Sequence, residues 1–348
     1  MNDLRRIQEW DGEARPESTN RIRIASGGSR AACMVTGAAG FIGSRLCARL
    51  LGEGWRVVGL DGFTDSYSTL EKRERARELV RHPHFELIAG DLAAMALDQP
   101  LAGVEAVFHL AGRAGVRPSF ELGGRYEHDN VTATRRLLAA CQASGTVRRV
   151  VYASSSSVYG VASVPFREDA APAPISPYGC TKLEAERLCL AASGPSLETV
   201  ALRLFTVYGP GQRPDMALRR FAEAGLTGGE IELLGDGTQT RDFTHVDDVV
   251  QAFVRAADAP VDGLAVNVGG GSRVSLLEVL GLLEDLVDRP LRVSMSDVAR
   301  GDVPHTESDL ARASGLLGFR PQMCFAEGFA DEVNWLRRLR PELVARSG

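Results

Sequence analysis

The chain has 348 residues, of which 44% are hydrophobic and 24% charged, a composition typical of a globular protein with a core large enough for two lobes. Its net charge of −5 argues against the basic face of a nucleic-acid-binding protein, and no apolar run is long enough to span a bilayer. We therefore expect neither nucleic acid nor a membrane as a partner.

The N-terminal segment and the cysteines bear on the setting in which the protein works. Residues 1–30 contain no apolar segment of the kind that a secretory signal requires, and we interpret them as a poorly ordered leader. The six cysteines form no C-x-x-C pair and no cluster with histidines at metal-ligand spacing. We therefore expect no metal, and a reduced, cytoplasmic setting.

From residue 31 onward, apolar strand-like runs alternate with helical stretches. The runs span 32–36, 56–61, 85–91, 104–111, 147–154 and 198–205. This alternation predicts βαβ units and hence an α/β fold with a Rossmann-type, doubly wound parallel sheet. Between the second and third runs, LEKRERAREL at 70–79 mixes both charge signs at helical spacing, which predicts a helix with a solvated face.

The first run leads into a glycine loop, VTGAAGFIG at 35–43, and an acid ends the next run about 20 residues later. Gly37 would make the turn, Gly40 would let amides approach a pyrophosphate, and Gly43 would let the helix pack closely. Asp61 can accept hydrogen bonds from an adenosine ribose but would repel a 2′-phosphate. The loop predicts a dinucleotide site that prefers NAD to NADP, whereas the glycines alone would fit any tight turn.

Two later runs also end in polar residues at the same edge of the predicted sheet. GDL at 90–92 follows the third run, so Asp91 is expected beside the adenine ring, although an aspartate that caps a turn would look the same. YASSSSVYG at 152–160 closes the fifth run with four serines. A serine run is common in polar turns, but this one lies where the nicotinamide is expected.

A Tyr-x-x-x-Lys pair, YGCTK at 178–182, falls in the helical stretch after the serines. Because residues four apart share one helix face, the ammonium of Lys182 can lie near the phenol of Tyr178. Together with the positive nicotinamide ring, this cation is expected to lower the pKa of the tyrosine toward the working pH. Tyr178 could then remove a hydroxyl proton while hydride leaves the same carbon for NAD.

After about residue 206 the alternation loosens into shorter elements between loops. The pattern predicts a smaller C-terminal α/β substrate-binding lobe over the carboxyl ends of the strands, where open α/β sheets bind ligands. The helix HVDDVVQAFVRAAD and the strand LAVNVGG are expected to return to the first lobe. The predicted domains are an NAD-binding domain, 31–205 with about 244–268, and a nucleotide-sugar-binding lobe, 206–243 with 269–348.

The glycine loop, Ser155, and Tyr178 with Lys182, in this order, resemble the extended short-chain dehydrogenase/reductase family, and within it the NAD-dependent nucleotide-sugar epimerases and dehydratases. The resemblance runs from about residue 32 to about 320. It departs from the family at Gly112 and Ala133, where alanine and glycine are frequent. Its other motifs are HLAGRAGV at 109–116, NVTAT at 130–134, LRLFTVYGPGQRPDM at 202–216, GDGTQTRDFTHVDD at 235–248 and ARGDVPH at 299–305.

The resemblance implies tightly bound NAD in the first lobe, a UDP- or dTDP-sugar in the second, and a homodimer through helices near 120–144 and 177–193. It implies that Ser155 shares the hydrogen bond to the reacting sugar hydroxyl, and that Arg241 and Arg300 contact the diphosphate. The implied cofactor contacts are Gly37, Gly40, Phe41, Ile42, Gly43, Asp61, Asp91, Leu92, Leu110, Ala111, Tyr178 and Lys182.

The residues beside the serine run bear on the reaction. Dehydratases carry an Asp-Glu pair where this chain has Ser156 and Ser157, and UDP-glucuronate decarboxylases typically carry Glu at the second position. Ser156, Ser157, Thr206 and Arg213 resemble the carboxylate-contacting set of UDP-glucuronate 4-epimerases. We predict interconversion of UDP-glucuronate and UDP-galacturonate. A decarboxylase, a UDP-glucose-type 4-epimerase and a noncatalytic NAD-binding protein remain alternatives.

Overall fold

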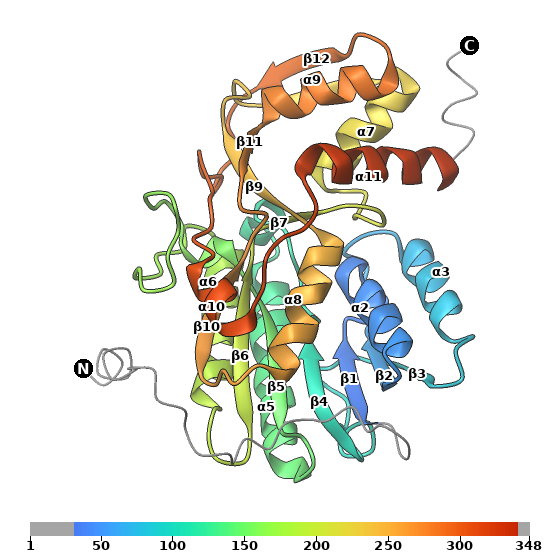
Figure 1. Ribbon diagram of the computed structural model, residues 1–348, viewed down its shortest axis with the longest axis vertical. Coiled ribbons are helices and arrows are strands. Elements are labelled where there is room, and N and C mark those ends of the chain that lie inside the picture. Colours follow the sequence, from blue (N-terminus) through green and yellow to red (C-terminus); the bar gives the residue numbers. More distant parts are fainter. Residues whose placement is uncertain (1–30, 340–348) are drawn as a thin grey trace.

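The computed structural model describes residues 31–339 (Figure 1). The predicted leader, 1–30, lies outside these residues. None of the helices in the described part of the chain is long and apolar enough to cross a membrane.

A parallel sheet forms the centre of the fold, and seven of its strands lie within the described residues. Across the sheet the strands are β3 (Phe85–Ala89), β2 (Arg56–Asp61), β1 (Ala32–Thr36), β4 (Val104–His109), β5 (Arg149–Ser155), β6 (Glu198–Leu204) and β10 (Leu264–Val268). The strand order reverses at β1, whose neighbours are β2 and β4. This confirms the predicted doubly wound sheet. The late strand β10 pairs with β6 at one edge of it. The reversal leaves a crevice at the carboxyl ends of β1 and β4.

Two hydrophobic cores cover the two faces of the sheet because side chains alternate along each strand. In β1, Cys33 and Val35 belong to one core and Met34 to the other. The first core includes α2 (Phe41–Gly52) and α8 (Val246–Asp258), and the second includes α5 (Ala133–Ser144) and α6 (Pro177–Ala191). The sheet is therefore buried on both faces, which accounts for its nearly continuous apolar strands.

A second group of elements lies beyond the carboxyl ends of the strands (Figure 1). Two small sheets, β11-β9-β7 and β12-β8, are present in the described part of the chain. Leu218, Leu283 and Phe329 belong to a third core, formed largely by α7, α9 and α11. The bounds are β7 (Thr206–Tyr208), α7 (Ala217–Thr227), β8 (Glu230–Leu234), β9 (Thr240–His245), β11 (Arg273–Ser275), α9 (Leu276–Val287), β12 (Arg292–Ser296) and α11 (Phe325–Leu339).

The shorter helices connect these parts. They are the 3-10 helices η1 (Arg117–Phe120) and η3 (Ser156–Val158), the α-helices α4 (Gly123–Tyr126) and α10 (Ala311–Leu317), and the π-helical segment η2 (Glu127–Thr132).

The mixed-charge helix α3 (Thr69–Leu79) forms where the sequence predicts it, but its charged residues are not simply solvated. Lys72 is buried, and its ammonium donates to the carbonyl of Thr64 at 2.8 Å. The carboxylate of Glu71 accepts a hydrogen bond from Arg219 of α7, and the Arg219 side chain is fully buried. The predicted solvated face is present, since Arg73, Glu74, Arg77 and Glu78 are exposed. The sequence did not reveal the second, charge-paired face, because charge alternation fits such an interface as well as it fits solvent.

A buried ion pair fixes α6 against the sheet. The guanidinium of Arg203 in β6 donates to both carboxylate oxygens of Glu186 in α6, at 2.7 and 3.0 Å. The hydroxyl of Ser154 donates to the same carboxylate at 2.5 Å, and Arg203 also donates to the hydroxyl of Tyr159 at 2.9 Å. Since both charges are buried, each depends on the other for compensation.

We predict that Arg203→Met lowers the free energy of unfolding by about 3–5 kcal/mol, because it leaves Glu186 buried without its cation. Urea denaturation measures this change. The control is Arg49→Met, which removes an exposed arginine that pairs with Glu53 at the surface of α2, and it should change stability by less than about 1 kcal/mol. Similar losses in the two variants would contradict the role given to burial.

Candidate active site

A cleft of about 1180 Å³ opens along the carboxyl ends of the central strands. Every residue predicted for a catalytic, cofactor-binding or substrate-binding role lines this cleft, from Gly37 after β1 to Arg300 after β12. The fold therefore brings all of these side chains to one site. Their individual roles stay predictions.

The glycine loop joins β1 to α2 by a turn that requires glycine. Gly37 has a φ of +73°, in the left-handed region that favours glycine. A Cβ on Gly43 would lie only 2.1 Å from the carbonyl oxygen of Gly37. Gly40 precedes the helix without a side-chain cap, so the first amides of α2 are available to an anion in the cleft. The loop thus has the geometry of a phosphate-binding turn.

Asp61, at the end of β2, is held rigidly beside this loop. Its buried carboxylate accepts hydrogen bonds from the amide of Ala39 at 3.0 Å and from that of Phe63 at 2.8 Å. Because each carboxylate oxygen has a second acceptor position, ribose hydroxyls can still bind there. The arrangement suits a dinucleotide whose adenosine ribose carries free hydroxyls.

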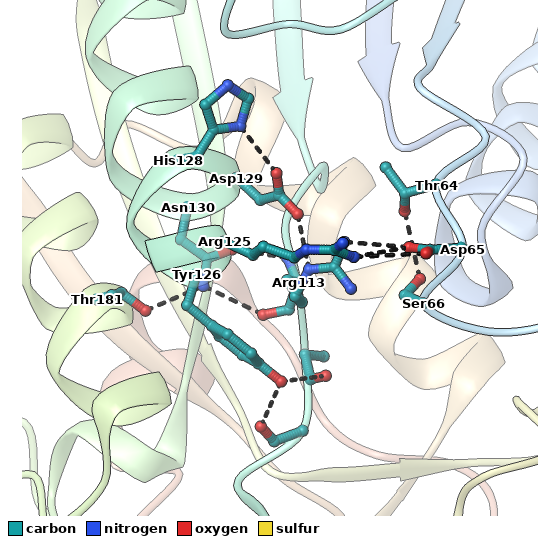
Figure 2. A network of polar contacts seen from close by, with 12 residues as sticks. Thr64, Asp65, Ser66, Arg113, Arg125, Tyr126, His128, Asp129, Asn130 and Thr181 are labelled. Atoms are coloured by element: carbon teal, nitrogen blue, oxygen red, sulfur yellow. Dashed lines mark hydrogen bonds and ion pairs between the residues drawn. The ribbon is translucent and has the colours of Figure 1, made fainter. Parts of the chain in front are cut away.

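The opposite wall is the segment after β4, which Asn130 anchors (Figure 2). The amide of Arg113 donates to the side-chain oxygen of Asn130 at 2.6 Å, and the side-chain nitrogen of Asn130 donates to the Arg113 carbonyl and to Thr181. The hydroxyl of Tyr126 donates to the carbonyl of Gly115 at 2.8 Å. These contacts connect the wall to η2 and to α6.

Charged side chains meet beside this wall, as Figure 2 shows. The guanidinium of Arg113 donates to Asp129 at 2.8 Å and lies 3.7 Å from Asp65. Arg125 reaches Asp65 from α4 at 3.4 Å. Sequence reasoning missed Arg113 and Asp65, although Arg113 lies within the quoted HLAGRAGV motif.

His109, at the end of β4, has a structural role. Its ring nitrogens bond the hydroxyls of Thr36 and Thr134, each at 2.8 Å. Burial, with a smaller contribution from Lys182, lowers the pKa of His109 to about 3. The ring is therefore neutral at physiological pH, and it links β4 to β1 and α5.

The predicted catalytic residues meet at the ends of β5 and α6. Ser176 caps α6 by accepting a hydrogen bond from the amide of Gly179 at 3.0 Å, so Tyr178 lies in the first turn and Lys182 one turn later. Ser155 is near enough to Tyr178 for its side chain to act on the pKa of the phenol. Lys182 donates to the carbonyl of Ala153. Serine, tyrosine and lysine thus share one corner of the cleft.

Burial dominates the pKa values in this corner. It lowers the pKa of Lys182 to about 7, against the opposing effect of Glu186. It raises the pKa of Tyr178, while the side chain of Ser155 and the charge of Arg213 act to lower it. For the protein alone, desolvation of the phenolate outweighs the nearby charges. The predicted lowering depends on the nicotinamide ring as well as on Lys182, so it stays a prediction.

The predicted substrate-binding arginines line the rest of the cleft. Arg213 donates through Nε and Nη2 to Asp215, at 3.0 and 2.6 Å, and its guanidinium lies 5.2 Å from the ring centre of Tyr67. Arg241 donates to Asp302 at 2.5 Å. Arg300 lies 4.2 Å from the ring centre of Phe120. Sequence reasoning missed Tyr67 and Asp215, although Asp215 lies within the quoted LRLFTVYGPGQRPDM motif.

Comparisons with known proteins agree with this site. Residues 33–269 match the model of the NAD dependent epimerase/dehydratase family, and the chain belongs to that family. It is 38% identical to an uncharacterised UDP-glucose epimerase of Bacillus subtilis, over 88% of this chain and 98% of the relative. It is 37% identical to a UDP-glucuronate 4-epimerase of Thermodesulfobacterium geofontis, over 87% of this chain and 95% of the relative.

One solved structure of a related enzyme contains both a substrate and a cofactor. It is the UDP-glucuronic acid 4-epimerase of Bacillus cereus in complex with UDP-glucuronic acid and NAD. This enzyme is 35% identical to the chain, with a TM-score of 0.83, and the match covers 88% of this chain and 99% of the other.

We predict that Gly43→Ala reduces the amount of NAD that copurifies with the protein at least tenfold. The added Cβ would meet the carbonyl of Gly37 and push α2 away from the turn. Absorbance ratios and extraction of the nucleotide measure NAD content. Gly52→Ala, in the last position of the same helix and with open space around the new Cβ, is the control and should retain NAD. Full NAD content in Gly43→Ala would contradict the role of the loop.

Proposed function

We propose that the protein is an NAD-dependent UDP-glucuronate 4-epimerase that interconverts UDP-glucuronate and UDP-galacturonate. One observation carries this proposal: Arg213 and the hydroxyl-bearing residues Ser156, Ser157 and Thr206 line the same cleft as Tyr178. A guanidinium next to hydroxyl donors suits a sugar carboxylate and offers little to a neutral hydroxymethyl group. The named relatives from Thermodesulfobacterium geofontis and Bacillus cereus support the same activity.

NAD, when bound, would accept hydride from C4 of the sugar and return it to the other face of the 4-keto intermediate. The glycine loop and Asp61 would hold its pyrophosphate and adenosine ribose. We assign these groups to the part of the chain built on 31–205 and about 244–268, and the sugar nucleotide mainly to 206–243 and 269–348. Arg241 and Arg300 would bind the diphosphate of the sugar nucleotide.

Ser155, Tyr178 and Lys182 would carry out the proton transfer. Tyr178 would remove the proton of the C4 hydroxyl and later return it, with Ser155 sharing the hydrogen bond. Burial raises the pKa of Tyr178, so the phenolate needs positive charge nearby. Arg213 already acts in that direction. Lys182, whose pKa burial lowers to about 7, would contribute in its protonated form.

The residues around the sugar carboxylate would also protect the intermediate. A 4-keto uronate is a β-keto acid and loses carbon dioxide readily unless the carboxylate is held away from the orientation needed for cleavage. Arg213 would hold it from one side and the hydroxyls of Ser156, Ser157 and Thr206 from another. The absence of a glutamate at Ser157 distinguishes this site from the pattern of the decarboxylases.

We further propose that the protein works in the cytoplasm as a homodimer. The adjacent helices α5 and α6 are the candidate interface, as in the family that the sequence resembles. Sedimentation of the purified protein tests the oligomeric state independently of the activity.

A UDP-glucose-type 4-epimerase is the second candidate, and one contact favours it. Asp215 already neutralises Arg213, so a neutral sugar would not leave that arginine without a partner. The name of the Bacillus subtilis relative points the same way. Separate incubations with UDP-glucuronate and with UDP-glucose, both without added NAD, distinguish the candidates. Conversion of UDP-glucuronate to an isomer of unchanged mass supports our proposal. Rapid conversion of UDP-glucose, with no reaction of UDP-glucuronate, supports the second candidate. Loss of carbon dioxide would indicate a decarboxylase.

We predict that Tyr178→Phe abolishes epimerisation, with a loss of about a thousandfold in kcat, because it removes the phenolic oxygen that would take up the hydroxyl proton. The variant should still copurify with NAD, since the glycine loop is unchanged. Turnover is measured by chromatography of the sugar nucleotides. Near-normal turnover would rule out the assignment of Tyr178 as the base.

We predict that Arg213→Ala lowers kcat/KM for UDP-glucuronate by about ten- to a hundredfold, the loss expected when a charged hydrogen-bond partner of the sugar carboxylate is removed. Activity with UDP-glucose should change much less, because that sugar has no carboxylate. The ratio of the two kcat/KM values is the measurement. Equal losses with both substrates would remove the carboxylate role of Arg213.

A further inference from the structure

Arg213 is held by more than its own loop. Asp215 occupies one edge of the guanidinium, formed by Nε and Nη2. The ring of Tyr67 lies 5.2 Å from the guanidinium carbon and covers a face of the group. A guanidinium is planar and donates hydrogen bonds within its plane. These contacts therefore leave the edge formed by Nη1 and Nη2 as the place where a second carboxylate can bind.

Tyr67 is itself fixed by the mixed-charge helix α3. Its hydroxyl accepts a hydrogen bond from Nη1 of Arg75 at 3.0 Å. The same guanidinium donates through Nη2 to the carbonyl of Gly211 at 2.8 Å. Arg75 therefore holds both the ring against Arg213 and the backbone two residues before Arg213.

A second arginine anchors the neighbouring peptide. Nη1 of Arg219 donates to the carbonyl of Gln212 at 2.7 Å, and the side-chain oxygen of Gln212 accepts from the Arg219 amide at 3.0 Å. The side chain of Arg219 is completely buried. The backbone on the N-terminal side of Arg213 is thus fixed at two successive residues.

Glu71 joins the two anchors. Its carboxylate accepts from both terminal nitrogens of Arg219, at 2.7 and 2.9 Å, and from Arg75 at 3.2 Å. Unlike Tyr67 and Arg213, the residues Glu71, Arg75 and Arg219 are not among those that line the cleft. They can influence a bound sugar only through the side chains in front of them.

We propose that Tyr67, backed by Arg75, Glu71 and Arg219, orients Arg213 and thereby determines selectivity for a sugar carboxylate. The proposal rests on the carboxylate role of Arg213 under the proposed function and adds the positioning residues for it. These residues come from the loop and helix that follow Asp61, the predicted ribose-binding acid. Residues next to the predicted cofactor site would thus determine which sugar the cleft selects.

The test is equilibrium binding, by calorimetry, of UDP-glucuronate and UDP-glucose to NAD-loaded protein carrying Tyr178→Phe, which prevents turnover. With Tyr67→Leu added, we expect about tenfold weaker binding of UDP-glucuronate, the size of a desolvated cation–π contact, and less than about a twofold change for UDP-glucose. Tyr67→Phe keeps the ring and should retain the selectivity within about twofold.

Arg75→Met tests the anchor behind the ring. It should reduce the preference for UDP-glucuronate by about fivefold, because both Tyr67 and the Gly211 carbonyl lose their donor. Arg77→Met is the matched control, since Arg77 belongs to the same helix but is exposed, and the control should bind both ligands like the parent protein. A loss in Arg77→Met equal to that in Arg75→Met would overturn the proposal.

The outcomes separate this proposal from the proposed function. Unchanged or equally weakened binding of both ligands in Tyr67→Leu overturns the positioning role, even if the wild-type protein epimerises UDP-glucuronate. Selective weakening of UDP-glucuronate binding supports the positioning role, even if the wild-type protein shows no epimerase turnover. Equal affinity of the parent protein for the two ligands overturns it together with the carboxylate role of Arg213.

Discussion

The close contact between α2 and the turn after β1 is the constraint on which the cleft depends. Because Gly43 has no side chain, the helix packs against the carbonyl of Gly37, and its first amides face the crevice at the reversal of the sheet. The carboxylate of Asp61 accepts a hydrogen bond from the amide of Ala39 in the same loop. A larger residue at Gly43 would disturb the turn, the helix and the acid together.

Buried ion pairs support both halves of the site from behind. Glu186 in α6 accepts hydrogen bonds from Arg203 in β6 and from Ser154 in β5. It therefore fixes both the helix that carries Tyr178 and the strand that carries Ser155. Glu71 and Arg219 do the same for the loop of Arg213. Buried pairs add little net stability over apolar side chains of similar volume. Their advantage here is orientation, since functional groups need neighbours that hold them in one conformation.

The charges around Arg213 explain how one cleft can distinguish sugars that differ only at C6. Asp215 and the ring of Tyr67 limit the directions in which the guanidinium can donate. A sugar carboxylate placed at the remaining edge would gain a charged pair, whereas a neutral sugar would leave that edge to solvent. Selectivity on this view depends on the direction of Arg213, and that direction is set by residues distant in sequence.

The sequence by itself determined the doubly wound sheet, the glycine loop and the set of residues at the cleft, because periodicity and fixed motif spacing are local properties of the chain. It could not determine the partners of α3, since Glu71, Lys72 and Arg75 carry charges that suit either water or a buried interface. It also could not show that burial raises the pKa of Tyr178 in the protein alone. Pairing and desolvation depend on contacts between segments far apart in the chain, and only the tertiary structure decides them.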